Sequence, residues 1–108
     1  MTRPDDAVDG AALLDSMLSE KDFQAQIVKL ATTRGWRVKH EYDSRRGDPG
    51  WPDLRMLRPP RAIDVEVKTE KGRLSKDQRE VLDLLAACGQ VVFLWRPSDW
   101  DTIVEVLR

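Results

Sequence analysis

Three side chains in the middle of the chain have the types and spacing of a hydrolytic cation site. Glu66 and Lys68 are two residues apart, so in an extended strand they share one side, about 7 Å apart. Asp53 precedes Glu66 by thirteen residues, and a short antiparallel hairpin would return it to Glu66. Two carboxylates suit a hard cation such as Mg²⁺, and the amine suits water or developing phosphate charge. The sequence therefore predicts an oxygen-ligand cation site with a lysine beside it.

The alternative for these residues is a plain ion pair. Glu-x-Lys on the outer face of a strand is common as a same-face pair. The surrounding order is more specific, because a Gly50-Trp51-Pro52 turn delivers Asp53 to a strand start and a later helix carries Gln78 in its first turn. This combination favours a cation site over a plain ion pair.

Helices are predicted where capping signals precede apolar residues at helical spacing. Ser19 is an N-cap for a helix over about 20–34, which Gly35 ends. Ser75 and Gln78 form a capping box for a second helix, which runs to Gly89. Pro97-Ser98 opens a third helix, which carries Ile103, Val104 and Leu107.

Strands are predicted from alternation and short apolar runs. The predicted strands are 36–42, 53–57, 61–68 and 91–95. The last is continuously apolar and suits a sheet interior. The order α-β-β-β-α-β-α predicts an α/β fold (a mixed α+β sheet) of four strands flanked by helices. The first three strands would form an antiparallel meander, and the last two a parallel pair crossed by a helix.

Composition limits the class of protein. The chain has 108 residues, 41% hydrophobic and 34% charged, which predicts one globular domain over 19–108 and an acidic arm over 1–18. One cysteine and one histidine exclude an internal disulfide and a Cys/His zinc site. We expect Cys88 to be a buried thiol. The absence of a long apolar run predicts no membrane partner, no secretion and a cytoplasmic location.

Charge is distributed unevenly. The net charge is −1, yet residues 34–61 carry eight basic against four acidic side chains, seven of the eight being arginine. Arginine suits bidentate contacts to phosphate. The alternative to a phosphate-binding surface is a solvated surface of mixed charge.

Five segments together resemble the PD-(D/E)xK nuclease superfamily and, within it, the VRR-NUC (virus-type replication-repair nuclease) family. The resemblance extends from about Ser19 to Arg108. The matching segments are Ser19-Glu20 with Phe23-Gln24, GWPDL at 50–54, DVEVKT at 64–69, GRLSKDQ at 72–78 and VVFLWRP at 91–97. Small stand-alone phage and bacterial members are the most similar.

This resemblance implies a restriction-endonuclease-like fold and a DNA endonuclease that depends on Mg²⁺ or Mn²⁺, with one or two ions per site. It implies metal ligation by Asp53, Glu66, the Val67 carbonyl and Glu20, with Lys68 as the catalytic lysine and Gln78 as a positioning group. It further implies a homodimer that cuts branched DNA, like a Holliday-junction resolvase, during replication, recombination or repair in a bacterial or phage-infected cell.

Each carried-over residue has a second interpretation. Glu20 could merely complement the positive end of its helix, and Gln78 could merely complete its capping box. Asp53 could cap a turn.

Residues near the predicted site are also open to two interpretations. Trp51 could stack on a base or pack its turn. Arg45 and Arg46 are the expected phosphate contacts, on a loop whose charges depart from the family pattern. His40 is expected to be partly buried. Asp64 is expected to be exposed, near Arg55 or Arg58.

Two other functions remain open. A non-catalytic nucleic-acid-binding module would bind DNA without metal dependence, and a structural adaptor would have no DNA affinity.

Overall fold

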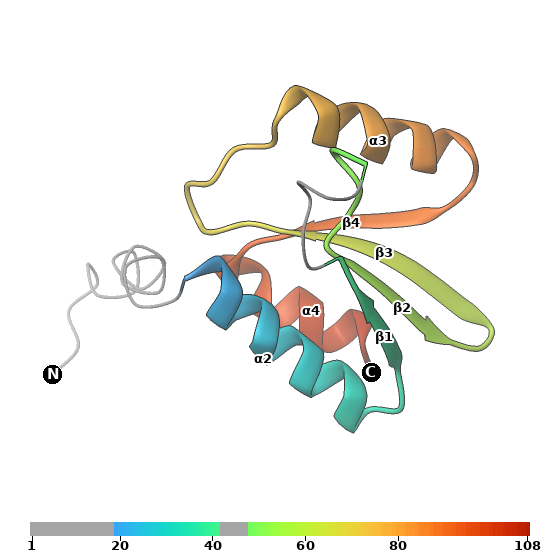
Figure 1. Ribbon diagram of the computed structural model, residues 1–108. Helices are drawn as coiled ribbons and strands as arrows, with labels where there is room; N and C mark the ends of the chain where they lie inside the picture. Colours follow the sequence, from blue (N-terminus) through green and yellow to red (C-terminus); the bar gives the residue numbers. More distant parts are fainter. Residues whose placement is uncertain (1–18, 42–47) are drawn as a thin grey trace, which may run out of the picture.

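A computed structural model describes residues 19–41 and 48–108 of the chain (Figure 1). In chain order the elements are α2 (Glu20–Thr33), β1 (Arg37–His40), β2 (Leu54–Arg58), β3 (Arg61–Val67), α3 (Lys76–Ala87), β4 (Val91–Trp95), the 3-10 turn η1 (Pro97–Asp99) and α4 (Trp100–Val106). This confirms the predicted order of elements. The arm over 1–18 lies outside the described residues, as do Arg45 and Arg46.

The four described strands form one mixed sheet in the order β1-β2-β3-β4. β2 is antiparallel to both β1 and β3, and β4 is parallel to β3. The predicted meander and helical crossover are therefore confirmed. The expected interior position of 91–95 is wrong, because β4 is an edge strand of the described sheet and Val91 is 51% exposed. Its inward side chains, Phe93 and Trp95, stack with ring centroids 5.2 Å apart.

Helices cover the two faces of the sheet unequally. α2 and α4 lie together on one face, and α3 lies on the other (Figure 1). α2 buries Phe23, Ile27 and Ala31, which recur every four residues and so form one stripe. α3 contributes a single buried side chain, Leu82. The main core is thus on the α2 side, and the sheet face toward α3 is free to carry polar groups.

The predicted helix caps are present. Ser19 Oγ accepts a hydrogen bond from the Asp22 N–H at 3.0 Å. Ser75 Oγ accepts from the Gln78 N–H at 3.1 Å, and Gln78 Oε1 accepts from the Ser75 N–H at 2.9 Å. Each cap satisfies N–H groups that a helix start leaves unpaired.

Three arginines of the basic middle third stabilise the C-terminal helix. The guanidinium groups of Arg58 and Arg61 lie 4.9 and 4.6 Å from the ring centroid of Trp36. Together with Arg34 and the Trp36 indole, they donate to main-chain oxygens at the end of α4. The acceptors are the main-chain oxygens of Val104, Val106, Leu107 and Arg108. These carbonyls have no partner within the helix, so this arginine cluster serves the fold instead of forming one phosphate-binding surface.

Two local predictions are corrected. The first strand is Arg37–His40 instead of 36–42: Trp36 precedes it with a buried side chain, and Tyr42 lies outside the described residues. Cys88 is exposed, because it is the C-cap of a helix that buries only Leu82. No helix in 19–41 or 48–108 is long and apolar enough to cross a membrane.

Candidate active site

The β2–β3 hairpin brings Asp53 to Glu66. Leu54 is paired with Val65 in the antiparallel register, so the preceding residue, Asp53, lies opposite Glu66. Asp53 Oδ2 accepts a hydrogen bond from the Val67 N–H at 2.8 Å. The hairpin return inferred from sequence is therefore present, and the Asp53 carboxylate is fixed to the strand that carries the second acid.

The turn before Asp53 is seated on the start of α3. Gly50 has φ +92°, and a Cβ placed on it would lie 2.5 Å from the Asp77 carbonyl oxygen. Only glycine tolerates both the left-handed backbone and that close approach. Pro52 is buried. Gly50 thus explains the glycine of the GWPD motif: it lets the turn contact α3 while delivering Asp53 to β2.

A third carboxylate comes from the first turn of α2. Ligand oxygens of Glu20, Asp53 and Glu66 all lie within 4.8 Å of one another. The β2–β3 hairpin and the more distant α2 therefore direct three acids to one point. Oxygen-only donors at this spacing suit a hard divalent cation that keeps several waters.

The acids at this point disfavour each other's charge. Burial, together with the hydrogen bond and negative charge of Asp53, raises the pKa of Glu66 to about 9, although the Lys68 charge opposes the rise. Burial likewise raises the pKa of Glu20, and the Lys68 charge counters it. For both carboxyl groups the Lys68 charge therefore only partly offsets the effect of burial.

Glu66 provides the test of whether these residues fit a cation. The side chain is fully buried (0% exposed), and its Oε2 has no hydrogen-bond partner among the described residues. A buried carboxylate oxygen without a partner costs several kcal/mol unless a cation or proton satisfies it. The donor set, the spacing and this oxygen agree with a bound divalent ion.

Gln78 makes contacts that fit both of the interpretations considered for it. Its Oε1 completes the capping box at Ser75, and its Nε2 lies 3.4 Å from Glu66 Oε1. The amide therefore connects the start of α3 to the buried acid, and the two interpretations are compatible.

Lys68 follows the last residue of β3. Its N–H donates to the Trp95 carbonyl at 3.0 Å, which extends the β3–β4 pairing by one residue. Its side chain is half-buried, and its charge acts on both Glu20 and Glu66. The Lys68 charge therefore acts on two members of the acidic cluster formed by Glu20, Asp53 and Glu66.

Arg96 is a residue that the sequence reasoning left without a role. Its Nη1 donates to the carbonyls of Thr69, Glu70 and Gly72 at 2.8, 3.3 and 2.6 Å. These carbonyls belong to the loop directly after Lys68, so Arg96 fixes the path by which the chain leaves β3. The only sequence signal was its place in the VVFLWRP segment.

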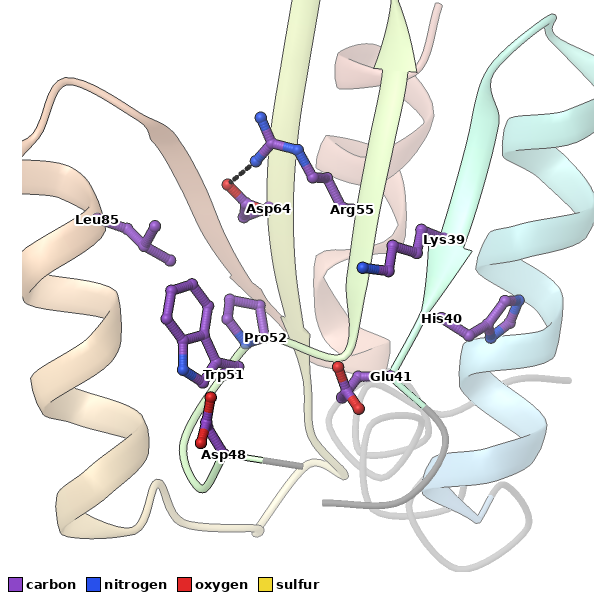
Figure 2. A pocket seen from close by; sticks show the side chains of 9 residues that line it. All are labelled: Lys39, His40, Glu41, Asp48, Trp51, Pro52, Arg55, Asp64 and Leu85. Carbon is purple, nitrogen blue, oxygen red and sulfur yellow. Dashed lines mark hydrogen bonds and ion pairs between the residues drawn. The ribbon is translucent and has the colours of Figure 1, made fainter. Parts of the chain in front are cut away.

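The acidic cluster borders a cavity of about 690 Å³ between α2 and the 48–53 turn. A second cavity, of about 420 Å³, lies between α3 and the β1–β2 side of the sheet (Figure 2). His40, Glu41 and Trp51 line both. Trp51 is 50% exposed, so its indole is accessible to a ligand. His40 is half-buried as expected, with Nδ1 3.3 Å from Gln24 Nε2.

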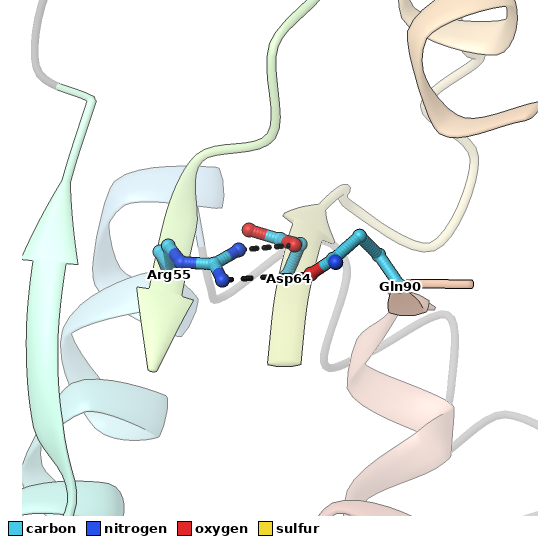
Figure 3. Close-up of polar contacts among 3 residues, drawn as sticks. All are labelled: Arg55, Asp64 and Gln90. Atoms are coloured by element: carbon cyan, nitrogen blue, oxygen red, sulfur yellow. Dashed lines mark hydrogen bonds and ion pairs between the residues drawn. The ribbon is translucent and has the colours of Figure 1, made fainter. Parts of the chain in front are cut away.

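The structure changes the expectation for Asp64. Asp64 is 6% exposed rather than solvated, but its partner is Arg55, as the sequence suggested, with Arg55 Nη1 2.7 Å from Asp64 Oδ2. Arg55 Nη2 also donates to Gln90 Oε1 at 3.5 Å (Figure 3). The burial arises because Asp64 lies on the sheet face that α3 partly covers.

Comparison with known proteins gives one family match. The VRR-NUC domain model matches residues 12–98, a range that holds every residue of the acidic cluster as well as Lys68, Gln78 and Arg96. No curated protein and no solved structure matches the chain. Because the match spans most of the sequence, the chain belongs to the VRR-NUC domain family.

Proposed function

We propose that this nuclease domain is a divalent-metal-dependent DNA endonuclease. Asp53, Glu66, the Val67 carbonyl and Glu20 would hold Mg²⁺ or Mn²⁺. The observation that carries the proposal is the convergence of three carboxylates within 4.8 Å around a buried Glu66 oxygen that has no hydrogen-bond partner in the described part of the chain. Such a site has no evident structural purpose, since repelling buried acids destabilise a fold.

The residues of the chain have separable tasks in hydrolysis of a phosphodiester. A bound divalent ion would polarise the phosphate and lower the pKa of the attacking water. Lys68 would orient that water and offset the negative charge that develops on the phosphate oxygens. Gln78 would fix the Glu66 carboxylate through its Nε2 contact, and the Asp53 carboxylate is held by the Val67 N–H.

Cleavage assays with and without metal test this proposal. Four-way junction, flap and linear duplex DNA would be incubated with wild type, Lys68→Ala and a control, Lys29→Ala, in Mg²⁺, Mn²⁺ or EDTA. Lys29 is exposed on α2, about 13 Å along the helix from Glu20. We expect metal-dependent cutting that Lys68→Ala reduces by about a hundredfold and Lys29→Ala leaves unchanged.

Other outcomes would assign a different function. Salt-dependent DNA binding without cutting in either metal would indicate a non-catalytic binding module. A lack of DNA affinity at low salt would indicate a structural adaptor. Equal loss of activity in both lysine variants would remove the specific role of Lys68.

The resemblance to small stand-alone family members supports a finer proposal, a homodimer acting on branched DNA. A two-fold dimer would present two active sites to two strands, as paired nicks at a junction require. Sedimentation at micromolar concentration, with and without junction DNA, checks the dimer. A monomer under both conditions would refute it.

A further inference from the structure

The cavity between α3 and the β1–β2 side of the sheet, named here the α3 cavity, has walls of two kinds. Figure 2 shows Trp51 and Leu85 on the α3 side, with Lys39 and Glu41 opposite. The Arg55–Asp64 pair closes one end. Its volume is about 420 Å³, within the range of cavities that hold small planar ligands.

The charges of the α3 cavity disfavour a phosphate. Of the side chains in 19–41 and 48–108, two cationic ones line it, against three carboxylates, and the Arg55 cation is already paired with Asp64 at 2.7 Å. The carboxylates are Glu41, Asp48 and Asp64. A dianionic or backbone phosphate would meet more repulsion than attraction here.

A neutral planar heterocycle fits these walls better. Trp51 offers a half-exposed indole, and stacking on an aromatic ring suits every nucleobase. Asp64 and Gln90 hold the Arg55 guanidinium in place (Figure 3), so donors and acceptors at the rim are fixed in position. The Gly50 turn seated on α3 also fixes the backbone that carries Trp51.

The α3 cavity adjoins the acidic cluster. It shares His40, Glu41 and Trp51 with the cavity that Glu20 and Asp53 line. An occupant of the α3 cavity would therefore lie near the DNA phosphate that the acidic cluster is proposed to hydrolyse. A base within a duplex is stacked on both faces and cannot enter, so the occupant must be unpaired or extruded.

We propose that the α3 cavity is a subsite for one unpaired nucleobase of the DNA substrate, with Trp51 as its stacking platform. This proposal rests on the nuclease function proposed above. It gives that site a physical basis for choosing DNA with unpaired or distorted positions over regular duplex.

Binding of DNA with single abasic substitutions tests the subsite. A Lys68→Ala protein would be titrated with flap and bulged duplexes in which one unpaired nucleotide at a time is normal or abasic. The same titrations would be repeated with added Trp51→Ala, Trp51→Phe or, as a control, Leu84→Ala. Leu84 is 64% exposed and does not line the α3 cavity, and thermal unfolding would verify that each variant folds.

We expect one unpaired position at which removing the base weakens binding about tenfold. This loss should persist with Leu84→Ala, persist in large part with Trp51→Phe and vanish with Trp51→Ala. Equal binding of normal and abasic DNA at every position would overturn the subsite, as would a Trp51→Ala loss of equal size for both DNAs.

Cleavage by the protein with Lys68 intact separates the two proposals. Metal-dependent cutting without a base effect would refute the subsite alone. A base effect without cutting in Mg²⁺ or Mn²⁺ would refute the proposed endonuclease and leave a nucleobase-binding site.

Discussion

Replacing Glu66 by glutamine separates the destabilisation of the fold by the acidic cluster from the proposed role of the cluster in binding a divalent ion. In the metal-free protein, burial and Asp53 raise the pKa of Glu66 from 4.5 to about 9. A carboxyl whose pKa is raised by folding contributes its stability fully below pH 4.5, and that stability is lost as the pH rises toward 9. Metal-free wild type should therefore become less stable between pH 5 and pH 8.

The size of this effect follows from linkage. Each pH unit between the unfolded and folded pKa values changes the free energy of unfolding by about 1.4 kcal/mol. From pH 4.5 to pH 7 the loss is about 3 kcal/mol. Glutamine has nearly the same shape and no charge to lose, and its amide retains a donor toward Asp53. Glu66→Gln should thus exceed wild type by about 3 kcal/mol at pH 7 in EDTA.

Urea unfolding in EDTA at pH 5, 6, 7 and 8 measures this difference, with Glu80→Gln as the control because Glu80 is exposed on α3. Mg²⁺ at about a hundred times its dissociation constant should then stabilise wild type by about 2.7 kcal/mol and have little effect on Glu66→Gln. The reasoning fails if Glu66→Gln is no more stable than wild type at pH 7, or if wild-type stability is the same at pH 5 and pH 8.

Three further variants test the elements that hold the site. Gly50→Ala should lower the unfolding free energy by about 1–3 kcal/mol and reduce cleavage, because its Cβ would meet the Asp77 carbonyl at 2.5 Å; unchanged melting and activity would contradict the close contact. Arg96→Gln should lower kcat about tenfold with little change in KM, since it frees the loop after Lys68, and Arg96→Lys should restore part of the rate; a rise in KM alone would argue against this positioning role. Arg61→Ala should lower the free energy of unfolding by about 1–3 kcal/mol, because it loses the Trp36 contact and the donors to α4. Cleavage well below the melting temperature should stay at the wild-type level. A selective loss of cleavage would place Arg61 at the DNA.

Local patterns predicted most of the elements. Ser19 and the Ser75–Gln78 capping box marked both helix starts correctly, because a cap depends on residues within one turn. The β2–β3 hairpin followed from the short separation of thirteen positions between Asp53 and Glu66, so the approach of the two acids was also predictable.

The sequence-based predictions of exposure were wrong where the burial of a side chain depends on whether another element packs over it. The same polar face of β3 carries Asp64 and Glu66, which are 6% and 0% exposed, because other elements cover it. Cys88 is exposed because it is the C-cap of α3, a helix in which only Leu82 is buried. Val91 is exposed because β4 has a neighbour on one side only within the described sheet. The periodicity of a strand or helix predicts the face on which a side chain lies, but not whether another element buries that face.

The sequence by itself determined the family, the element order and the acids and lysine of the candidate site, since motif spacing within a strand or a hairpin is a local property. Only the tertiary structure decided which partner each of these arginine side chains contacts. It assigned Arg58 and Arg61 to the end of α4, Arg55 to Asp64 and Arg96 to the loop after Lys68. Each of these contacts joins segments separated by nine residues or more, and composition cannot encode which arginine meets which acceptor.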